Sequence, residues 1–222
     1  MRCPSRPRWS MFPKFRKIVD LTKPIVDRMA VYPGDPLVAV TEVAHRETDG
    51  FAVAAIHLND HTGTHMETQA HMIPGKCLAD ELPERFLGTA AVVAVRGPSI
   101  AIEDLAPAEP LIRRNPFVLL FTGYTDRRSD IDPHDPQRPI IGLQALEWLC
   151  DKGIQLLGID AFDFDSGPPY PGHRLLFKRN VLVIEGLVGL APLSAREVTL
   201  IALPLKIAGT GGSPCRVLAL VE

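Results

Sequence analysis

Three histidines and a glutamate lie between positions 61 and 71, in the segment His61-Thr-Gly-Thr-His65-Met-Glu67-Thr-Gln-Ala-His71. The whole chain has only seven histidines, so this segment holds a large share of its imidazole groups. A straight strand would point all four side chains to one face, because they occupy alternate positions. It would also hold His61 and His65 roughly 13 Å apart, at about 3.3 Å per residue. A metal ion with bonds of about 2.0–2.1 Å to nitrogen cannot bridge that distance, so a shared site requires the chain to turn.

The tripeptide between His61 and His65 offers the place for that turn. It contains Gly63, and glycine adopts backbone angles that other residues avoid. A helix would also bring the two histidines to one face, but threonine and glycine are poor helix formers. We therefore expect a turn at Gly63 and then a short strand in which His65 and Glu67 share a face.

Length and composition predict one globular domain with a full core. The chain has 222 residues, 46% hydrophobic and 23% charged, with a net charge of −2. This charge disfavours nucleic acid or an anionic membrane as a partner. No apolar run approaches the roughly 20 residues that span a bilayer. The four cysteines form no C-x-x-C pair, which argues against a thiolate zinc site or a disulfide scaffold and favours reduced thiols in the cytoplasm.

The chain divides into a basic N-terminal tail over residues 1–17 and a domain over residues 18–222. The tail has six basic residues, no acidic residue and no apolar signal-peptide core, so we expect it to be disordered. In the domain, short apolar runs bounded by turn residues predict strands. These runs are 18–24, 52–58, 90–95, 117–121, 156–159, 181–184, 199–203 and 216–221.

One segment has the apolar spacing of a helix, namely residues 143–152, followed by Gly153 at the usual C-terminal stop. Leu143, Leu146, Leu149 and Cys150 would share its buried face. Together with the predicted strands, this helix indicates an α/β domain with a substantial sheet and few helices.

The ligand types in the 61–71 segment point to a metal. Imidazole and carboxylate groups suit zinc, manganese or iron. A catalytic metal site is the favoured interpretation. A purely structural metal site, or histidines that bond only to backbone groups, remain the alternatives.

A second polar cluster lies in the other half of the chain. Asp160, Asp163 and Asp165 follow the predicted strand 156–159, where ligand-binding loops of α/β sheets commonly lie. Each of these aspartates is equally compatible with a solvated turn. Glu185 ends an apolar run before a glycine, and a carboxylate at such a position is buried only if it is paired or binds a metal.

Two other mechanisms lack their sequence patterns. No G-x-S-x-G elbow of a serine hydrolase is present. The glycine-rich stretch 209–214 leads into a strand pattern through Pro214, which supports neither a phosphate loop nor a dinucleotide-binding motif. We expect it to be an ordinary turn before the last strand.

The segment H-T-G-T-H-x-E-x-x-x-H, together with several shorter stretches, resembles the metal-dependent cyclase family, which includes bacterial kynurenine formamidases (arylformamidases) and isatin hydrolases. The likeness extends from residue 18 to the end of the chain. Similar landmarks are Val31-Tyr-Pro-Gly-Asp35, Leu87-Gly88, Thr122-Gly123-Tyr124, Gly158-Ile-Asp160, Ile184-Glu185-Gly186-Leu187 and Leu205-Lys206-Ile207.

This resemblance implies a swivelling β/β/α domain of the cyclase type, with a mixed sheet, assembled as a homodimer or homotetramer. It also implies hydrolysis of a small amide, formamide or lactam by a water that Zn²⁺ or Mn²⁺ activates, with one or two ions per chain. The principal ion would be bound by His61, His65 and Glu67. The remaining polar positions, where some members bind a second ion, match His71, His173 and Glu185, and either His71 or His173 would act as acid and base.

The chain departs from the family pattern at two positions near the expected site. Glu67 replaces the usual aspartate, and Ala161-Phe162-Asp163 replaces a Thr-Pro-Ser-like run that lines the substrate pocket. The departures leave the metal and the substrate open. A lactone hydrolase, a cyclase-like lyase and a metal-dependent binding module without turnover remain alternatives.

Overall fold

A computed structural model of the chain describes residues 15–127 and 130–222. Positions 1–14 of the expected tail lie outside these residues, and the first strand begins at Lys17. The strands are β1 (Lys17–Asp20), β2 (Ala39–Ala44), β3 (Val53–His57), β4 (His65–Glu67), β5 (Leu87–Ala94), β6 (Ser99–Ile100), β7 (Phe117–Phe121), β8 (Ile140–Ile141), β9 (Leu156–Ile159), β10 (Leu182–Glu185), β11 (Glu197–Pro204) and β12 (Gly212–Val221).

Helices are short and fewer. The α-helices are α1 (Arg46–Asp49), α2 (Ile102–Leu105), α3 (Glu109–Ile112), α4 (Tyr124–Arg127), α5 (Leu143–Asp151) and α6 (Pro171–Lys178). The 3-10 turns are η1 (Gln69–His71), η2 (Leu78–Asp80), η3 (Pro83–Phe86), η4 (Ala106–Ala108) and η5 (Ala191–Leu193). Within the described residues, no helix has the length and apolar character needed to cross a bilayer.

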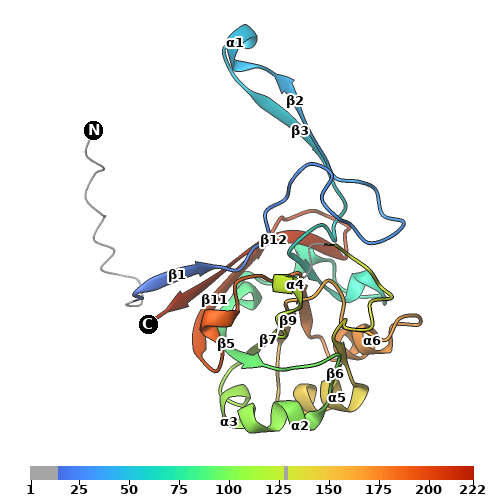
Figure 1. The fold of residues 1–222 in the computed structure, drawn as a ribbon, viewed down its shortest axis with the longest axis vertical. Coiled ribbons are helices and arrows are strands. Elements are labelled where there is room, and N and C mark those ends of the chain that lie inside the picture. Colours follow the sequence, from blue (N-terminus) through green and yellow to red (C-terminus); the bar gives the residue numbers. More distant parts are fainter. Residues whose placement is uncertain (1–14, 128–129) are drawn as a thin grey trace.

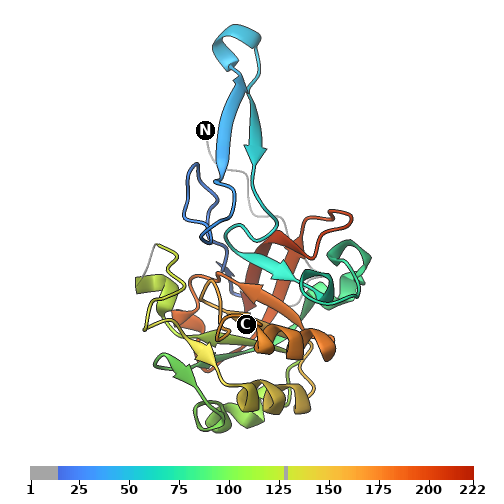
Figure 2. The ribbon, with the colours of Figure 1, turned by 90° about the vertical axis from the view of Figure 1, so that its right-hand side faces the viewer.

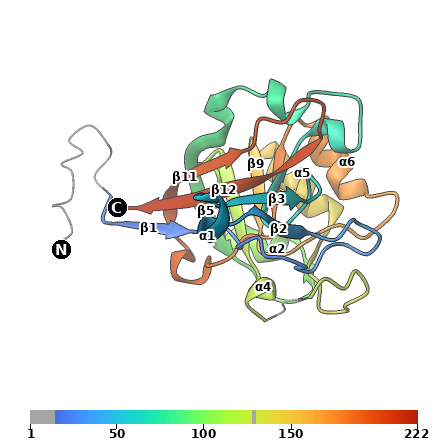
Figure 3. The same ribbon diagram turned by 90° about the horizontal axis from the view of Figure 1, so that it is seen from above.

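The main sheet closes on itself. Its strand order is β1-β12-β11-β5-β7-β9-β10-β4, and β4 also pairs with β12, which completes a ring of strands from β12 to β4 (Figure 1). The pairs β5–β7, β7–β9 and β9–β10 are parallel, whereas β11, β12 and β4 join antiparallel, so the sheet is mixed. Strand β1 lies outside the ring, along the C-terminal half of β12 (Figure 3).

Alternation along the strands separates two apolar cores. In β7, Phe117 and Leu119 point into the ring, while Val118 and Leu120 point outward, because successive strand residues face opposite sides. The outward residues pack against the buried faces of α5 and α6, which include Leu146, Leu149, Leu176 and Phe177. Both faces of the parallel strands are therefore covered, which explains their continuous apolar runs.

A hairpin made of β2 and β3 projects from this body and carries α1 at its tip (Figure 2). Every residue of β3 is exposed, and Val43 and Ile56 expose 59% and 63% of their surface. The hairpin belongs to a separate two-stranded sheet, so it contributes nothing to either core.

Most predicted strands and the predicted helix are present, with boundaries displaced by a few residues. The helix prediction is confirmed as α5, although Leu143 is 45% exposed because it lies at the very start of the helix. The stretch 209–214 is not only a turn: β12 begins at Gly212 and pairs with β4, so this part of the prediction was wrong. Strand β2 and helix α6 were not predicted.

Candidate metal centre

Strand β4 places two of the predicted ligands on one face. It lies between β10 and β12, and Met66 points into the ring core, so His65 and Glu67 point outward. Nε2 of His65 lies 3.0 Å from Oε1 of Glu67, which confirms that the two residues share a face. The antiparallel register sets Glu185 of β10 opposite His65, and Oε2 of Glu185 lies 3.8 Å from His65 Nε2.

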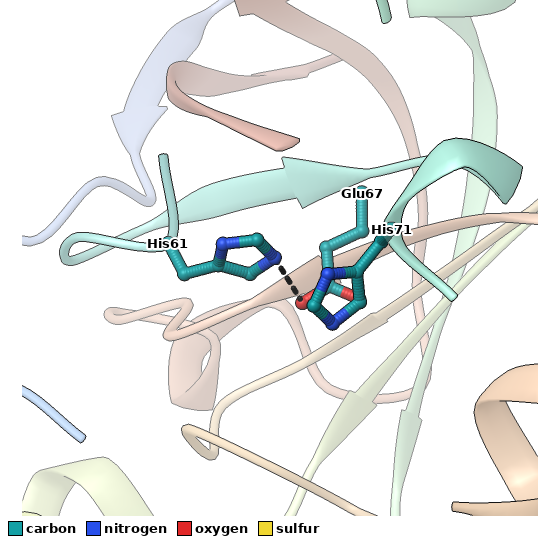
Figure 4. Close-up of side chains that lie close together, drawn as sticks. All are labelled: His61, Glu67 and His71. Atoms are coloured by element: carbon teal, nitrogen blue, oxygen red, sulfur yellow. Dashed lines mark ion pairs between the residues drawn. The ribbon is translucent and has the colours of Figure 1, made fainter. Parts of the chain in front are cut away.

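The turn before β4 occurs where the distance argument requires it. Gly63 has φ +68°, and its carbonyl oxygen accepts a hydrogen bond from Nδ1 of His65 at 3.1 Å. This bond leaves Nε2 of His65 as the nitrogen that faces the carboxylates. The turn also brings His61 back, so that its Nε2 lies 3.6 Å from Oε1 of Glu67 (Figure 4).

His71 ends the segment on the short turn η1. Its ring centroid lies 4.2 Å from that of His61, and both rings face the carboxylate of Glu67 (Figure 4). One donor atom from each of His61, Glu67 and His71 lies within 4.8 Å of the others. Burial, together with the neighbouring histidines, lowers the pKa of His71 to about 4. His71 is therefore neutral near pH 7, the state in which imidazole binds a metal or accepts a proton.

Helix α6 supplies the fourth histidine from the distant half of the chain. His173 packs against the ring of Phe164 at 4.3 Å between centroids, and Asp165 Oδ2 lies 3.0 Å from its Nδ1. Its Nε2 lies 3.3 Å from Oε1 of Glu185 and 3.6 Å from Oε2 of Glu67. Asp165 thus orients the ring so that Nε2 faces the two glutamates.

The buried charges influence one another strongly. Burial alone would lower the pKa of His65, but its hydrogen bond to Glu67 raises it. Burial would raise the pKa of Glu67, but His65 and His173 hold it below its ordinary value. Burial and the adjacent Glu67 carboxylate raise the pKa of Glu185 to about 8. Two carboxylates this close need a cation between them to be ionised together.

The three aspartates after β9 have different surroundings. Asp160 accepts hydrogen bonds from Thr122 and Gly123, so it holds a loop and does not face the centre. Asp165 orients His173, as described above. Asp163 is 6% exposed, and Arg138 Nη1 lies 3.2 Å from its Oδ2. Sequence reasoning missed Arg138, because a lone arginine before a proline has no distinguishing pattern.

The centre opens into a cavity of about 370 Å³, a size suited to a small organic molecule. Aromatic side chains line it, including Tyr32, Tyr124, Phe162 and Tyr170. Burial and a hydrogen bond with Tyr170 raise the pKa of Tyr32 to about 12. Phe162 and Asp163 both line the cavity, as the unusual 161–163 loop led us to expect.

The donor set fits a divalent cation. All six predicted residues line the cavity, and they come from β4, β10, α6, the turn η1 and the segment before β4: His61, His65, Glu67, His71, His173 and Glu185. Nε2 of His61 and Oε2 of Glu67 are buried and have no hydrogen-bond partner among the described residues. Buried polar atoms without a partner are rare and costly, and a bound ion would satisfy both.

Comparison with known proteins agrees with this arrangement. Residues 19–166 match the family model described as "Putative cyclase". The chain is 30% identical to a kynurenine formamidase from Salinibacter ruber, over 90% of this chain and 95% of the relative. It is also 30% identical to an isatin hydrolase from Roseibium aggregatum, over 84% of this chain and 82% of the relative.

Solved structures give the same result. A protein from Bacillus stearothermophilus that is described as a predicted metal-dependent hydrolase superposes with a TM-score of 0.76 at 26% identity, covering 93% of this chain and 98% of the neighbour. An isatin hydrolase bound to thioisatinate, a product analogue, superposes with a TM-score of 0.79 at 26% identity, covering 93% and 92%. The mixed sheet and few helices of this chain, together with these superpositions, confirm the predicted fold of the cyclase type. The chain therefore belongs to the cyclase family of metal-dependent hydrolases.

Proposed function

We propose that this chain hydrolyses the C–N bond of a small formylkynurenine-like formamide or of a cyclic amide resembling isatin. As an amidohydrolase of the cyclase family, it acts on carbon–nitrogen bonds other than peptide bonds. One observation carries the proposal: four histidines and two glutamates converge beside a cavity, and two of their donor atoms lack a hydrogen-bond partner among the described residues. A structural metal site would not need an open cavity of about 370 Å³ at the ion.

We propose that His61, His65 and Glu67 hold a principal Zn²⁺ or Mn²⁺ ion, and that His71, His173 and Glu185 complete the site or hold a second ion. The ion would supply Lewis acidity, which lowers the pKa of water and polarises the substrate carbonyl. Glu67 is central to this assignment, since its two oxygens face the histidines of both halves of the chain.

His71 is proposed as the residue that moves the proton. Its ring has no hydrogen-bond partner among the described residues, it lines the cavity, and it is neutral near pH 7. It can therefore take the proton released by the attacking water and give it to the leaving nitrogen. His173 is less free to do this, because Asp165 and Glu185 contact its two ring nitrogens. We assign His173 to binding and keep it as the alternative acid and base.

The cavity walls support a flat, ring-containing substrate. Tyr32, Tyr124 and Phe162 offer aromatic faces, and the centroids of Tyr124 and Phe162 lie 5.9 Å apart. Aromatic rings favour such edge and offset contacts with one another. The carbonyl to be attacked would then face the histidines, which line the same cavity.

The test is hydrolysis by metal-stripped protein reloaded with Zn²⁺ or Mn²⁺, measured with N-formylkynurenine, isatin and a panel of lactones. Activity should depend on the added ion and fall at least about 100-fold in His65→Ala. His45→Ala on the exposed hairpin is the matched control and should remain fully active. If metal-stripped His65→Ala protein hydrolysed these substrates as fast as metal-loaded wild-type protein, the proposal would be overturned. Turnover of lactones alone would point to a lactone hydrolase, and metal binding without any turnover to a binding module.

We also propose that the protein works in the cytoplasm as a homodimer or homotetramer. The cysteines that the structure describes, Cys77, Cys150 and Cys215, are free thiols, which supports a reducing compartment. The exposed apolar residues of the β2–β3 hairpin support self-association, since an isolated hairpin is only marginally stable in water. Analytical ultracentrifugation at several concentrations tests this, and a monomer throughout would contradict it.

A further inference from the structure

A third carboxylate lies beside the centre, on the side of His173. One donor atom from each of Asp163, His173 and Glu185 lies within 4.8 Å of the others. We propose that Asp163 is itself a metal ligand that joins His173 and Glu185, beside Glu67, at the second cation position, and that it makes this position favour Mn²⁺ over Zn²⁺. This inference rests on the proposed function, which places the principal ion on His61, His65 and Glu67.

Glu67 connects the two positions. Its Oε1 lies 3.0 Å from Nε2 of His65 and 3.6 Å from Nε2 of His61. Its Oε2 points the other way, 3.6 Å from Nε2 of His173, and is buried without a hydrogen-bond partner among the described residues. An ion beside His173 would satisfy this oxygen, so Glu67 could contribute a ligand to both positions.

Asp163 retains the capacity to bind an ion in spite of its present contacts. Its Oδ1 accepts one hydrogen bond, from the backbone N–H of Asp165 at 2.8 Å, and its Oδ2 lies 3.2 Å from Nη1 of Arg138. A carboxylate oxygen has two lone pairs, so each of these contacts leaves one available. The backbone hydrogen bond also fixes the carboxylate, which reduces the ordering that metal binding requires.

The charge balance supports a cation at this position. Glu67, Glu185 and Asp163 are at most 6% exposed and line one cavity. Arg138 is buried beside Asp163, but it also donates to the carbonyl oxygen of Asp165 at 2.8 Å. Among the described residues, the Arg138 guanidinium is thus shared between Asp163 and a carbonyl group, while Glu67 and Glu185 face the imidazoles of His65 and His173. Buried carboxylates are stable in the ionised form when they are paired or bind a metal, and a divalent ion would supply the missing charge.

Ligand chemistry distinguishes the two positions. The position near His61, His65 and His71 is rich in imidazole, which suits zinc. The position near Asp163 offers one imidazole from His173 and three carboxylates, and oxygen-rich sets suit manganese or magnesium. The chain is thus expected to prefer different ions at the two positions, with Asp163 responsible for the preference at the second.

The experiment measures metal binding without reference to turnover. Full-length protein is stripped with a chelator, dialysed against known concentrations of Mn²⁺ or Zn²⁺, and its metal content measured by mass spectrometry. Wild-type protein should bind two Mn²⁺ ions per chain and show the electron paramagnetic resonance signal of a coupled pair. Asp163→Asn should keep the first ion, lose the coupled signal and bind the second at least about tenfold more weakly.

Two further variants separate ligand loss from misfolding. Asp163→Asn leaves Arg138 buried without its charge partner, so Asp163→Asn is also combined with Arg138→Met, which removes that charge. Asp160→Asn is the matched control, since Asp160 is a buried carboxylate after the same strand that faces Thr122 and Gly123. The control should keep two Mn²⁺ ions, and the double variant should lose the second.

Two results would overturn the inference: wild-type protein that binds only one ion of either metal, or Asp163→Asn protein with unchanged affinity for both ions. In the second case Asp163 serves only to pair with Arg138. Failure of the proposed function has a different signature, namely two bound ions without hydrolysis of any amide. Protein that hydrolyses an amide but binds only one ion would contradict the role of Asp163 and leave the proposed function standing.

Discussion

The centre is assembled from two kinds of support. Its strand half comprises His65 and Glu67 on β4 and Glu185 on β10, whose positions follow from the register of paired strands. Its second half, called the loop half because none of its residues lies on the sheet, comprises His61 in the segment before β4, His71 on η1 and His173 on α6. The comparison teaches that the strand half should fail together with the fold, whereas the loop half can be displaced while the fold persists.

The largest effect is expected from Glu67, the residue that joins the halves. Glu67→Gln keeps the shape of the side chain but removes the charge that faces His65 and His173. Loss of a residue that only supports a metal ligand lowers metal affinity or activity by about 10–100-fold. Glu67 is proposed as a ligand itself, so metal affinity and kcat/KM should fall by more than about 100-fold. Metal content and hydrolysis rates provide the measurement, with exposed Glu147→Gln as the control. Retention of metal and activity would show that the halves do not depend on Glu67.

The strand half should be sensitive to Gly186, immediately after β10. Its φ is +70°, and an added Cβ would lie 2.6 Å from the carbonyl oxygen of Gly63, in the turn before β4. We expect Gly186→Ala to lower the free energy of unfolding by about 2–4 kcal/mol, since left-handed strain and overpacking add. Urea denaturation measures this.

Gly153 provides the matched control for that substitution. It also has a positive φ, +83°, but an added Cβ would meet nothing within 4 Å. Gly153→Ala should therefore cost only the strain of the left-handed conformation, about 1–2 kcal/mol. Equal losses in the two variants would mean that the close approach of Gly186 to Gly63 is unimportant.

The loop half should respond to Asp165 without unfolding. Asp165→Asn weakens the contact that orients His173, so metal affinity should fall by about 10–100-fold. The melting temperature of the metal-free protein should change little by comparison. Metal titration and thermal unfolding of the same preparation test the two statements together. If Asp165→Asn greatly lowered the melting temperature but left metal affinity unchanged, the assignment of His173 to the loop half would be wrong.

The smallest effect is a pH dependence in metal-free protein. The pKa of Glu185 is raised from an ordinary 4.5 to about 8 by burial and by Glu67, so the folded state holds its proton more tightly than the unfolded state. This contribution to stability is fully present below about pH 4.5 and is lost as the pH rises to about 8. The difference in melting temperature between wild-type protein and Glu185→Gln should shift by a few degrees across this window. A flat difference would show that Glu185 titrates normally.

Local patterns in the sequence determined much of this molecule. The apolar runs of the sequence predicted β7 and β9. Both faces of these strands are buried, so nearly every residue along them is apolar. The spacing of His61 and His65 required a turn, and Gly63 adopts it, since only a bend lets two histidines so placed approach one carboxylate. The family pattern added His173 and Glu185, which no local argument could join to the segment.

Only the tertiary structure decided what surrounds β4. The pairing of β4 with β10 and β12 is long-range, and nothing in residues 65–67 specifies it. For the same reason the sequence did not show that β12 begins at Gly212, or that α6 carries His173 to Asp165. The direction of each carboxylate oxygen of Glu67 depends on partners from both halves of the chain. Ligand types are therefore properties of the sequence, whereas their convergence is a property of the closed sheet.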